Sequence, residues 1–428
     1  MTLDPVELLR QLIQIPSINP MGHDVSGPQF GEQRLTDFLQ DQCDRSGLRW
    51  LRQRVHPGRD NLLAIVRGYS APEQGGELLL WEVHQDTVPV EGMTIDPFGG
   101  DVRDGRVYGR GACDVKGGMA VMLAALSRVN LAKQRAITSP TIVLAFTVNE
   151  ECGYTGARAL PRLWLGSATT ADVIGGNITP ETMFPVTPQA SIVAEPTAFQ
   201  VVVAHQGIVR WRCRTIGRAT HTSRPANGIN AIYGMAQIVQ VVEQFHNELQ
   251  KGARSHPLCG HPTACVSVIQ GGVGVNTVPE CATIEIERRL GPAEEPAGAY
   301  HELIEYIAAN ANIGRCRVEY EPPFLESCGL DDKFNRAFGE RLVQLVRKNR
   351  AGCDLVGVPY GTDAPAIARE KVPTVIFGPG SIDQAHTADE FIEIEELELG
   401  VEIFYQIAKD GLGGHLNDRR QSQPMITA

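Results

Sequence analysis

Uninterrupted apolar runs in the first half of the chain predict buried β-strands. They occupy residues 61–66, 77–83, 141–148 and 191–196. Helical spacing of apolar residues occurs between two of these runs, at 117–129. A shorter helical pattern opens the chain, where Val6, Leu9, Leu12 and Ile13 precede two prolines. Strands that alternate with helices indicate an α/β fold whose strands are buried on both faces of the sheet.

The pattern changes from about residue 206. Residues 207–217 and 282–290 alternate between apolar and polar positions, as half-exposed strands do. Residues 230–245 and 299–311 have helical spacing, and 315–321 is again strand-like. This block suits a small α+β domain with its strands in one layer and two helices in the other.

The buried-strand pattern returns at 372–380, so the middle block interrupts the larger domain. We therefore predict a discontinuous domain of residues 1–205 and 322–428, with an inserted domain at 206–321. The tail from Gly411 has too little apolar content to pack, and we expect it to be unstructured.

Composition excludes several classes of partner. A chain of 428 residues with 43% hydrophobic content is long enough for two domains. Its net charge of -11 argues against a nucleic-acid surface, which needs clustered Lys and Arg. No leader pattern or long uncharged apolar run occurs, so we expect no membrane association. The ten cysteines include no C-x-x-C pair, which favours reduced thiols and a cytoplasmic location.

Side chains typical of metal ligands follow the predicted strands. In α/β sheets, active sites gather at the carboxyl ends of the strands. Histidine combined with carboxylates suits Zn²⁺, Co²⁺ or Mn²⁺. Each position alone also has an ordinary explanation, such as a surface histidine, a solvated loop or a helix N-cap. The candidates are His84, Asp86, Asp114, Glu150, Glu151, Glu195 and His386.

Seven ordered stretches carry a family resemblance. They are HQDTVP (84–89), DPFGGDVRDGRVYGRGACDVKGG (96–118), TVNEECGYTGA (147–157), EPT (195–197), GRATHTSRPANGINAI (217–232), GGVGVNTVPECATIEIERRLGP (271–292) and GPGSIDQAHTADE (378–390). Together, over about 8–407, they resemble the di-zinc aminoacylase and carboxypeptidase family. That family includes acetylornithine deacetylase, succinyl-diaminopimelate desuccinylase, aminoacylase and glutamate carboxypeptidase. The resemblance implies a di-zinc peptidase-like catalytic domain with an inserted lid and dimerisation domain.

The resemblance also implies a metal centre. His84 and Glu195 would hold one zinc, Glu151 and His386 would hold the other, and Asp114 would bridge them. Two Zn²⁺ per subunit are implied, with Co²⁺ or Mn²⁺ as substitutes.

Three further residues receive catalytic roles from the resemblance. Asp86 would orient His84, since a carboxylate beside a ligating histidine fixes the tautomer and orientation of its ring. Glu150 would be the general base. His221, in the inserted domain, would stabilise the oxyanion, and in relatives this histidine comes from the partner subunit of a homodimer.

The implied substrate is a small N-acylated L-amino acid. Arg289 would clamp its α-carboxylate, and Asn276 would lie on the substrate side. The loop 361–364, with Gly361 and Thr362, would complete the pocket, whereas Arg288 is expected to face outward. The motifs are most similar to acetylornithine deacetylase, with the desuccinylase or another family aminoacylase or carboxypeptidase as alternatives.

A non-catalytic metal-binding scaffold would be a different class of protein, and it would have no chemical need for Glu150. Residues 164–189 form a segment longer than usual for the family, which we expect to reshape the rim of the pocket.

Overall fold

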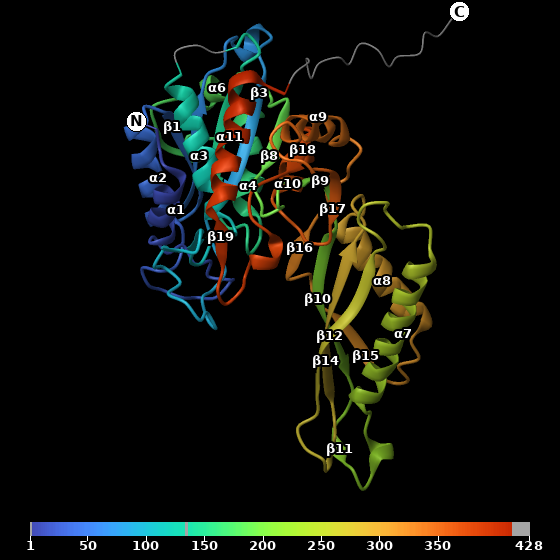
Figure 1. Ribbon diagram of the computed structural model, residues 1–428. Coiled ribbons are helices and arrows are strands. Elements are labelled where there is room, and N and C mark those ends of the chain that lie inside the picture. The colour runs from blue at the N-terminus through green and yellow to red at the C-terminus, as the bar shows by residue number, and fades with distance from the viewer. Residues whose placement is uncertain (1, 133–135, 413–428) are drawn as a thin grey trace, which may run out of the picture. The chain divides into compact units, whose positions relative to one another are not determined.

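The computed structural model describes residues 2–132 and 136–412, and the chain divides into two compact units (Figure 1). The first unit consists of residues up to 203, 333–356 and those from 362 onward. The second consists of Ala204–Asp332 and Gly357–Gly361. Residues 413–428 of the predicted unstructured tail lie outside the described residues.

The second unit is larger than the predicted insertion, 206–321. The chain adds strand β16 (Leu325–Ser327) to the second unit's sheet after residue 321, because β16 pairs with β10 (Gly207–Ile216). The segment Gly357–Gly361 has no apolar pattern of its own, so its assignment to this unit could not be read from hydrophobic periodicity.

A nine-stranded sheet organises the first unit. Its central strands β18, β8, β3 and β6 run parallel, and each is buried along its whole length. Both faces of a parallel sheet are covered by other elements, which is why these strands are continuous apolar runs. In spatial order the strands are β17 (Leu355–Val358), β9 (Val201–His205), β18 (Thr374–Ile376), β8 (Ala190–Val193), β3 (Leu78–His84), β6 (Thr141–Thr147), β2 (Arg59–Val66), β1 (Arg49–His56) and β7 (Val173–Gly176).

Helix α3 is the central helix of this unit. It packs against α1 and α11, and nearly all of its residues are buried (Figure 1). A small separate sheet consists of β4 (Asp101–Arg103) and β5 (Arg106–Tyr108), which precede α3 in the chain, and β19 (Phe391–Glu393), which comes after it. The helices are α1 (Pro5–Ile13), α2 (Gln33–Arg45), α3 (Lys116–Asn130), α4 (Thr155–Ala159), α5 (Pro161–Trp164), α6 (Pro180–Met183), α9 (Arg336–Val346), α10 (Ala364–Ala368) and α11 (Ile394–Asp410), with 3-10 turns η1 (Pro72–Gln74) and η3 (Ile382–Gln384).

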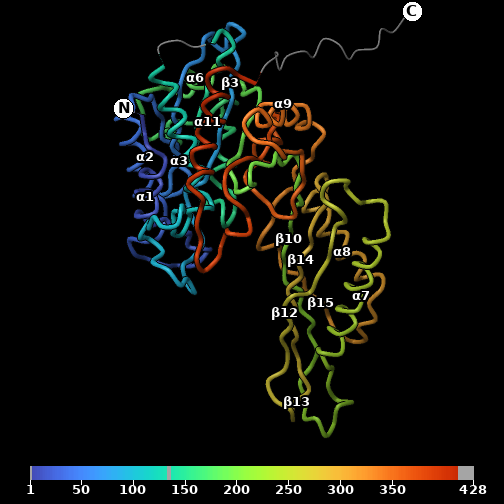
Figure 2. The backbone as a smooth tube through the Cα atoms, in the orientation of Figure 1, coloured from blue at the N-terminus to red at the C-terminus, as the bar shows by residue number. Residues whose placement is uncertain are grey.

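The second unit is a two-layer α+β domain, as predicted (Figure 2). Apolar side chains on one face of its sheet, such as Trp211 and Ile284, pack against its two long helices. Its sheet has the order β12 (Thr263–Gly271), β14 (Cys281–Leu290), β10 and β15 (Arg317–Tyr320); its other elements are β11 (Thr220–His221), β13 (Thr277–Val278), η2 (Pro225–Asn227), α7 (Ala231–Lys251) and α8 (Pro296–Asn310).

The segment 164–189 adds an edge to the main sheet. Its strand β7 pairs with β1, and it is separated from β6 by β1 and β2. The strand therefore extends the sheet rather than the rim beside β3 and β8. No helix within the described ranges is long and apolar enough to cross a membrane.

Candidate functional site

The carboxyl ends of three neighbouring parallel strands carry most of the predicted ligands. His84 is the last residue of β3, Glu150 and Glu151 follow β6, and Glu195 follows β8. Strand β3 lies between β8 and β6 and runs parallel to both. These side chains therefore lie at the same end of the sheet, where the parallel strands terminate, as the sequence pattern indicates.

Two loops bring the remaining ligands to this end of the sheet. Asp114 lies in the turn between β5 and α3, and His386 follows the η3 turn with a φ of 61°. The Asp114 carboxylate lies between the two histidines: Oδ1 is 3.2 Å from His84 Nε2, and Oδ2 is 3.3 Å from His386 Nε2. His386 Nε2 is also 3.4 Å from Glu151 Oε1.

These five residues form two groups of potential metal ligands that share Asp114. His84, Asp114 and Glu195 have ligand atoms within 4.8 Å of one another, and so do Asp114, Glu151 and His386. In addition, Glu151 Oε1 is buried and makes no hydrogen bond. These imidazole and carboxylate groups, including a buried oxygen without a hydrogen bond, would suit two divalent cations, with Asp114 available to both.

The electrostatics of the cluster agree with this fit. Burial raises the pKa of Glu151, and it raises the pKa of Glu195 to well above its usual range. Burial alone would lower the pKa of His84 and raise that of Asp114. Asp114, Glu150 and Glu195 outweigh burial at His84 and raise its pKa well above its usual range. His386 and His84 outweigh burial at Asp114 and lower its pKa. Asp114 and Glu151 together raise the pKa of His386 to about 10. Carboxylates this close together are stabilised by positive charge placed among them, which divalent cations held by neutral imidazoles would supply.

Glu150 belongs to neither ligand group, although it is adjacent to Glu151. It is buried, with 8% of its surface exposed. Burial, partly opposed by His84, and nearby carboxylates including Glu195 raise its pKa well above its usual range. A carboxylate with a raised pKa is the type of group that accepts a proton near neutral pH.

Asp86 lies at the centre of the hydrogen bonds that hold these residues. Its carboxylate accepts 3.1 Å bonds from the backbone N–H groups of Glu150 and Glu151, and a 2.7 Å bond from Asn19 Nδ2. His84 Nδ1 is 2.9 Å from the main-chain oxygen of Asp86 and 3.8 Å from its carboxylate. Asp86 therefore contacts His84 through its carbonyl, while its side chain fixes the Glu150–Glu151 turn.

The second unit brings two of the predicted residues together. His221 pairs with Thr277 across β11 and β13, and the Thr222 N–H donates to Asn276 O at 3.1 Å. His221 Nδ1 accepts from the Ser223 N–H at 3.1 Å.

Arg289 lies near the opposite end of β14 from this turn. Its Nε donates to Glu287 Oε1 at 2.8 Å, and its Nη1 donates to Pro359 O at 3.3 Å. The side chain keeps 28% of its surface exposed.

Arg288 does not face outward, contrary to the expectation. It is completely buried beneath α8, where it donates to Glu302 at 2.8 Å and to Glu294 at 3.2 Å. Two acidic partners and the ring of Phe245, 4.9 Å away, offset the cost of burying the guanidinium. Buried and more exposed side chains alternate along β14, but position 288 falls on the buried side, where Arg288 is held by ion pairs.

The pattern of the peptidase family M20/M25/M40 matches residues 80–410. The chain belongs to this family. It is 32% identical to the acetylornithine deacetylase of Photorhabdus laumondii subsp. laumondii over 91% of its length and 92% of that protein. It is 31% identical to the acetylornithine deacetylase of Proteus mirabilis, with 95% and 96% covered.

Solved structures of several peptidases have the same fold as this chain. The aminopeptidase PepT of Bacillus cereus superposes with a TM-score of 0.71 at 21% identity, over 96% of this chain and 98% of that one. The YXEP protein of Bacillus subtilis, a dinuclear metal-binding peptidase of the M20 family, gives 0.63 at 16% identity, over 95% and 97%. Membership makes the chain a metal-dependent hydrolase rather than a scaffold.

Several residues around the ligands of this M20/M25/M40 hydrolase were not found from the sequence. Glu32, the N-cap residue of α2, accepts from Arg59 at 2.5 Å and from the Asn149 N–H at 3.1 Å. It therefore holds the residue that precedes Glu150. No local motif marks Glu32 or Asn19, because each is one polar residue far in sequence from the loop it supports.

A second group of polar side chains involves β3 and β6, two of the strands that lead to the ligands. Thr147, the last residue of β6, donates to Glu82 of β3 and lies 3.3 Å from Asp363 Oδ2. Burial, countered in part by Thr147, raises the pKa of Glu82 to about 7. Asp363 adjoins Thr362, which is buried in the first unit, whereas Gly361 belongs to the second. The sequence marked the loop 361–364, which contains Asp363, but gave this acid no role of its own.

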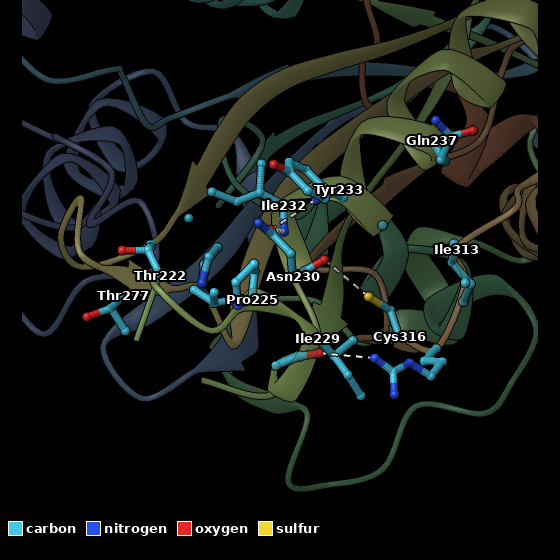
Figure 3. Close-up of a pocket in the computed structure, with 18 of the residues that line it drawn as sticks. Thr222, Pro225, Ile229, Asn230, Ile232, Tyr233, Gln237, Thr277, Ile313 and Cys316 are labelled. Atoms are coloured by element: carbon cyan, nitrogen blue, oxygen red, sulfur yellow. Dashed lines mark hydrogen bonds between the residues drawn. The ribbon is translucent and has the colours of Figure 1, made fainter. Parts of the chain in front are cut away.

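A pocket of about 1220 Å³ in the second unit contains none of the five potential ligands (Figure 3). Its walls include Asn230 and Tyr233 of the α7 start, Thr277 of β13, and Cys316, whose Sγ donates to Asn230 O. Thr222, next to His221, also lines it. The size of a cavity therefore does not identify the reactive part of this protein.

Proposed function

We propose that this hydrolase cleaves the amide bond of a small N-acyl-L-amino acid, with N-acetyl-L-ornithine as the best substrate. The observation that carries this proposal is the arrangement at the strand ends, where Asp114 is shared by two ligand groups and Glu150 lies outside both. Relatives named acetylornithine deacetylase, matched along nearly the whole chain, support the choice of acyl group and amino acid.

The donor set supports two Zn²⁺ per subunit, with Co²⁺ or Mn²⁺ as substitutes. His84 and Glu195 would hold one ion, Glu151 and His386 the other, and Asp114 both. When bound, such ions polarise the scissile carbonyl and lower the pKa of water.

The protein's own residues would move the proton. Glu150 would accept it from the water that attacks the acyl carbon, and would then deliver it to the leaving amine nitrogen. Because Asp86 binds the backbone of both Glu150 and Glu151, it would keep the base at a fixed position beside the ligand.

His221 is the proposed donor to the oxyanion. Its Nδ1 accepts a hydrogen bond from the Ser223 backbone, so the neutral ring carries its proton on Nε2. An exposed Nε2–H is free to donate to a developing negative charge. Asn276 would assist on the substrate side, and Arg289 would bind the α-carboxylate. The loop 361–364, with Gly361 and Thr362, would supply backbone hydrogen bonds to the substrate.

We also propose a homodimer formed through the second unit, the inserted lid and dimerisation domain. Strand β12 is the edge of its sheet and exposes Val268 and Ile269, and the following turn exposes Val273 and Val275. Exposed apolar residues on an unpaired edge are typical of a surface that a second chain covers. None of the ten cysteines, all within the described residues, forms a disulfide, which supports a cytoplasmic location.

A substrate panel tests the proposed reaction. Zinc- and cobalt-reconstituted protein is given N-acetyl-L-ornithine, N-succinyl-diaminopimelate, N-acetyl-methionine and a simple dipeptide. The highest kcat/KM is expected for N-acetyl-L-ornithine. Preference for the succinyl compound would move the assignment to a desuccinylase, and no turnover of any acylated compound would contradict the proposal.

A further inference from the structure

Glu390 is a buried carboxylate to which four hydrogen bonds are donated. Its Oε1 accepts from the backbone N–H groups of Cys113 and Asp114, both at 2.9 Å. Its Oε2 accepts from the Gly111 N–H at 3.0 Å and from Arg110 Nη1 at 2.6 Å. The side chain has no exposed surface. Since all four partners donate, the carboxylate form matches these surroundings.

The position of Glu390 follows from the pairing of two short strands. Strand β5 leads into the loop of Asp114, and β19 follows the loop of His386; the two strands are antiparallel, with Tyr108 opposite Phe391. The Gly109 N–H continues this pairing by donating to Glu390 O at 3.0 Å. The two ligand-bearing loops therefore run side by side, with the Glu390 side chain between them.

We propose that Glu390 is a positioning residue, which holds the main chain of Asp114 in register with the loop of His386 and thereby sets the geometry of both ligand groups. This inference rests on the proposed metal centre. Glu390 would act only through Asp114, the one residue present in both groups, so a displacement of this loop alters both sites at once.

Two substitutions separate contact geometry from charge. In Glu390→Gln the amide keeps one acceptor oxygen, but its NH₂ group faces donors on the other side. Glu390→Asp keeps the charge and withdraws the carboxylate by one methylene, so it no longer reaches all of its partners. Both changes should displace the Asp114 backbone.

The chain offers a matched control three residues away. Glu393 of β19 accepts from Arg106 Nε at 2.8 Å, so it is also a glutamate paired with an arginine, here one of strand β5. Its side chain is 40% exposed. Glu393→Gln therefore removes a comparable ion pair without removing a support of the Asp114 loop.

Zinc affinity, measured by competition with a chelator, is the first readout. Loss of an outer contact to a metal ligand typically costs 10-fold to 100-fold in affinity or activity, so Glu390→Gln and Glu390→Asp should each bind zinc about 10-fold to 100-fold more weakly. The second readout is kinetic: kcat should fall by a similar factor while KM changes by less than about threefold. Glu393→Gln should match the wild type in both, and circular dichroism should show all variants folded.

Each outcome decides between the possibilities. Equal zinc affinity and kcat in Glu390→Gln and Glu393→Gln would overturn the role of Glu390. So would loss of secondary structure in both Glu390 variants, because the residue would then serve folding alone. If Glu390→Asp matched the wild type in zinc affinity and kcat while Glu390→Gln was impaired, the charge of the residue would matter and its positioning role would be contradicted. Failure of the wild type itself to bind zinc would instead contradict the proposed metal centre.

Discussion

Glu150 and Glu151 are adjacent acids with different surroundings. Glu151 lies 3.4 Å from His386 and belongs to a ligand group, whereas Glu150 belongs to none. Glu150→Gln should therefore keep its zinc while kcat falls by about 10² to 10⁴, the usual contribution of a positioned base. The matched variant Glu151→Gln should lose zinc. Metal analysis beside kinetics checks both, and zinc loss from Glu150→Gln would make Glu150 a ligand instead.

Arg289 gives a test of substrate recognition. If it clamps the α-carboxylate, methyl-esterifying the substrate should lower kcat/KM by about 10-fold or more, given roughly 1.5–3 kcal/mol for a charged hydrogen bond. Arg289→Ala should remove the difference between acid and ester. Arg212→Ala, an exposed arginine of the same sheet, should preserve it. Equal turnover of acid and ester by the wild type would contradict the clamp.

Sequence reasoning reached the ligand candidates because each follows a recognisable strand or motif. It could not reach the residues that support them. Glu32 and Glu390 accept hydrogen bonds from backbone N–H groups of distant loops, and Asn19 donates to the carboxylate of Asp86. A single polar residue that supports a loop far away in the sequence leaves no local pattern that would identify it. Arg288 shows the related limit, since its buried acidic partners lie on another element.

At the scale of elements, helix α3 starts under tight steric constraint. A Cβ at Gly117 would lie 2.5 Å from Ala112 O and 2.7 Å from Ile392 Cδ1. Gly117→Ala should thus lower the melting temperature, although alanine favours a helix by about 1 kcal/mol. Gly298→Ala in α8 is the control, because no atom lies within 4 Å of its Cβ, and it should raise the melting temperature. Thermal unfolding measures both, and stabilisation by Gly117→Ala would show that the contact relaxes freely.

Strand β9 supplies a pH-dependent element. Burial lowers the pKa of His205 to about 4, and its Nδ1 lies 2.9 Å from Gln206 O. Between pH 6.5 and 4 the unfolded chain binds a proton that the folded chain does not, so this residue should lower the free energy of unfolding as pH falls, by up to about 3 kcal/mol. Denaturant titrations of metal-free protein at pH 7 and 4.5 should show this loss, reduced in His205→Gln. An equal loss in the variant would assign it to other groups.

The elements that the sequence predicted are those with a single dominant pattern. Continuous apolar runs became β2, β3, β6 and β8, and helical spacing became α3 and α7. Strand β1 was missed because polar residues such as Arg49 and Arg52 interrupt its apolar positions, and edge strand β7 because it is short and glycine-rich. Edge strands are half solvated, which removes the uniform apolar signal.

At the scale of the whole molecule, the proposed dimer predicts complementation. His221→Ala and Glu150→Gln should each be nearly inactive alone. If His221 acts in the partner's site, mixing them should restore up to about a quarter of wild-type activity, since hybrids of a twofold dimer contain one intact site. Activity after subunit exchange measures this, and no recovery despite exchange would place His221 in its own subunit's site.

A separate variant tests the surface itself. Ile269→Lys puts a charge on the exposed edge strand β12, and light scattering should then find monomers. Val102→Lys, at an exposed position of β4 in the first unit, should leave the dimer intact. A monomeric wild type would contradict the proposed assembly.

The order of strands in the main sheet has a consequence for synthesis. Strand β18 lies between β8 and β9, yet its residues come after the whole of the second unit in the sequence. During translation the sheet must remain open at this place until residues 374–376 leave the ribosome, and His386 and Glu390 emerge later still. The nascent protein can therefore complete its second unit before strand β18 and the His386 loop have been synthesised. Premature termination anywhere before His386 leaves an incomplete set of ligands.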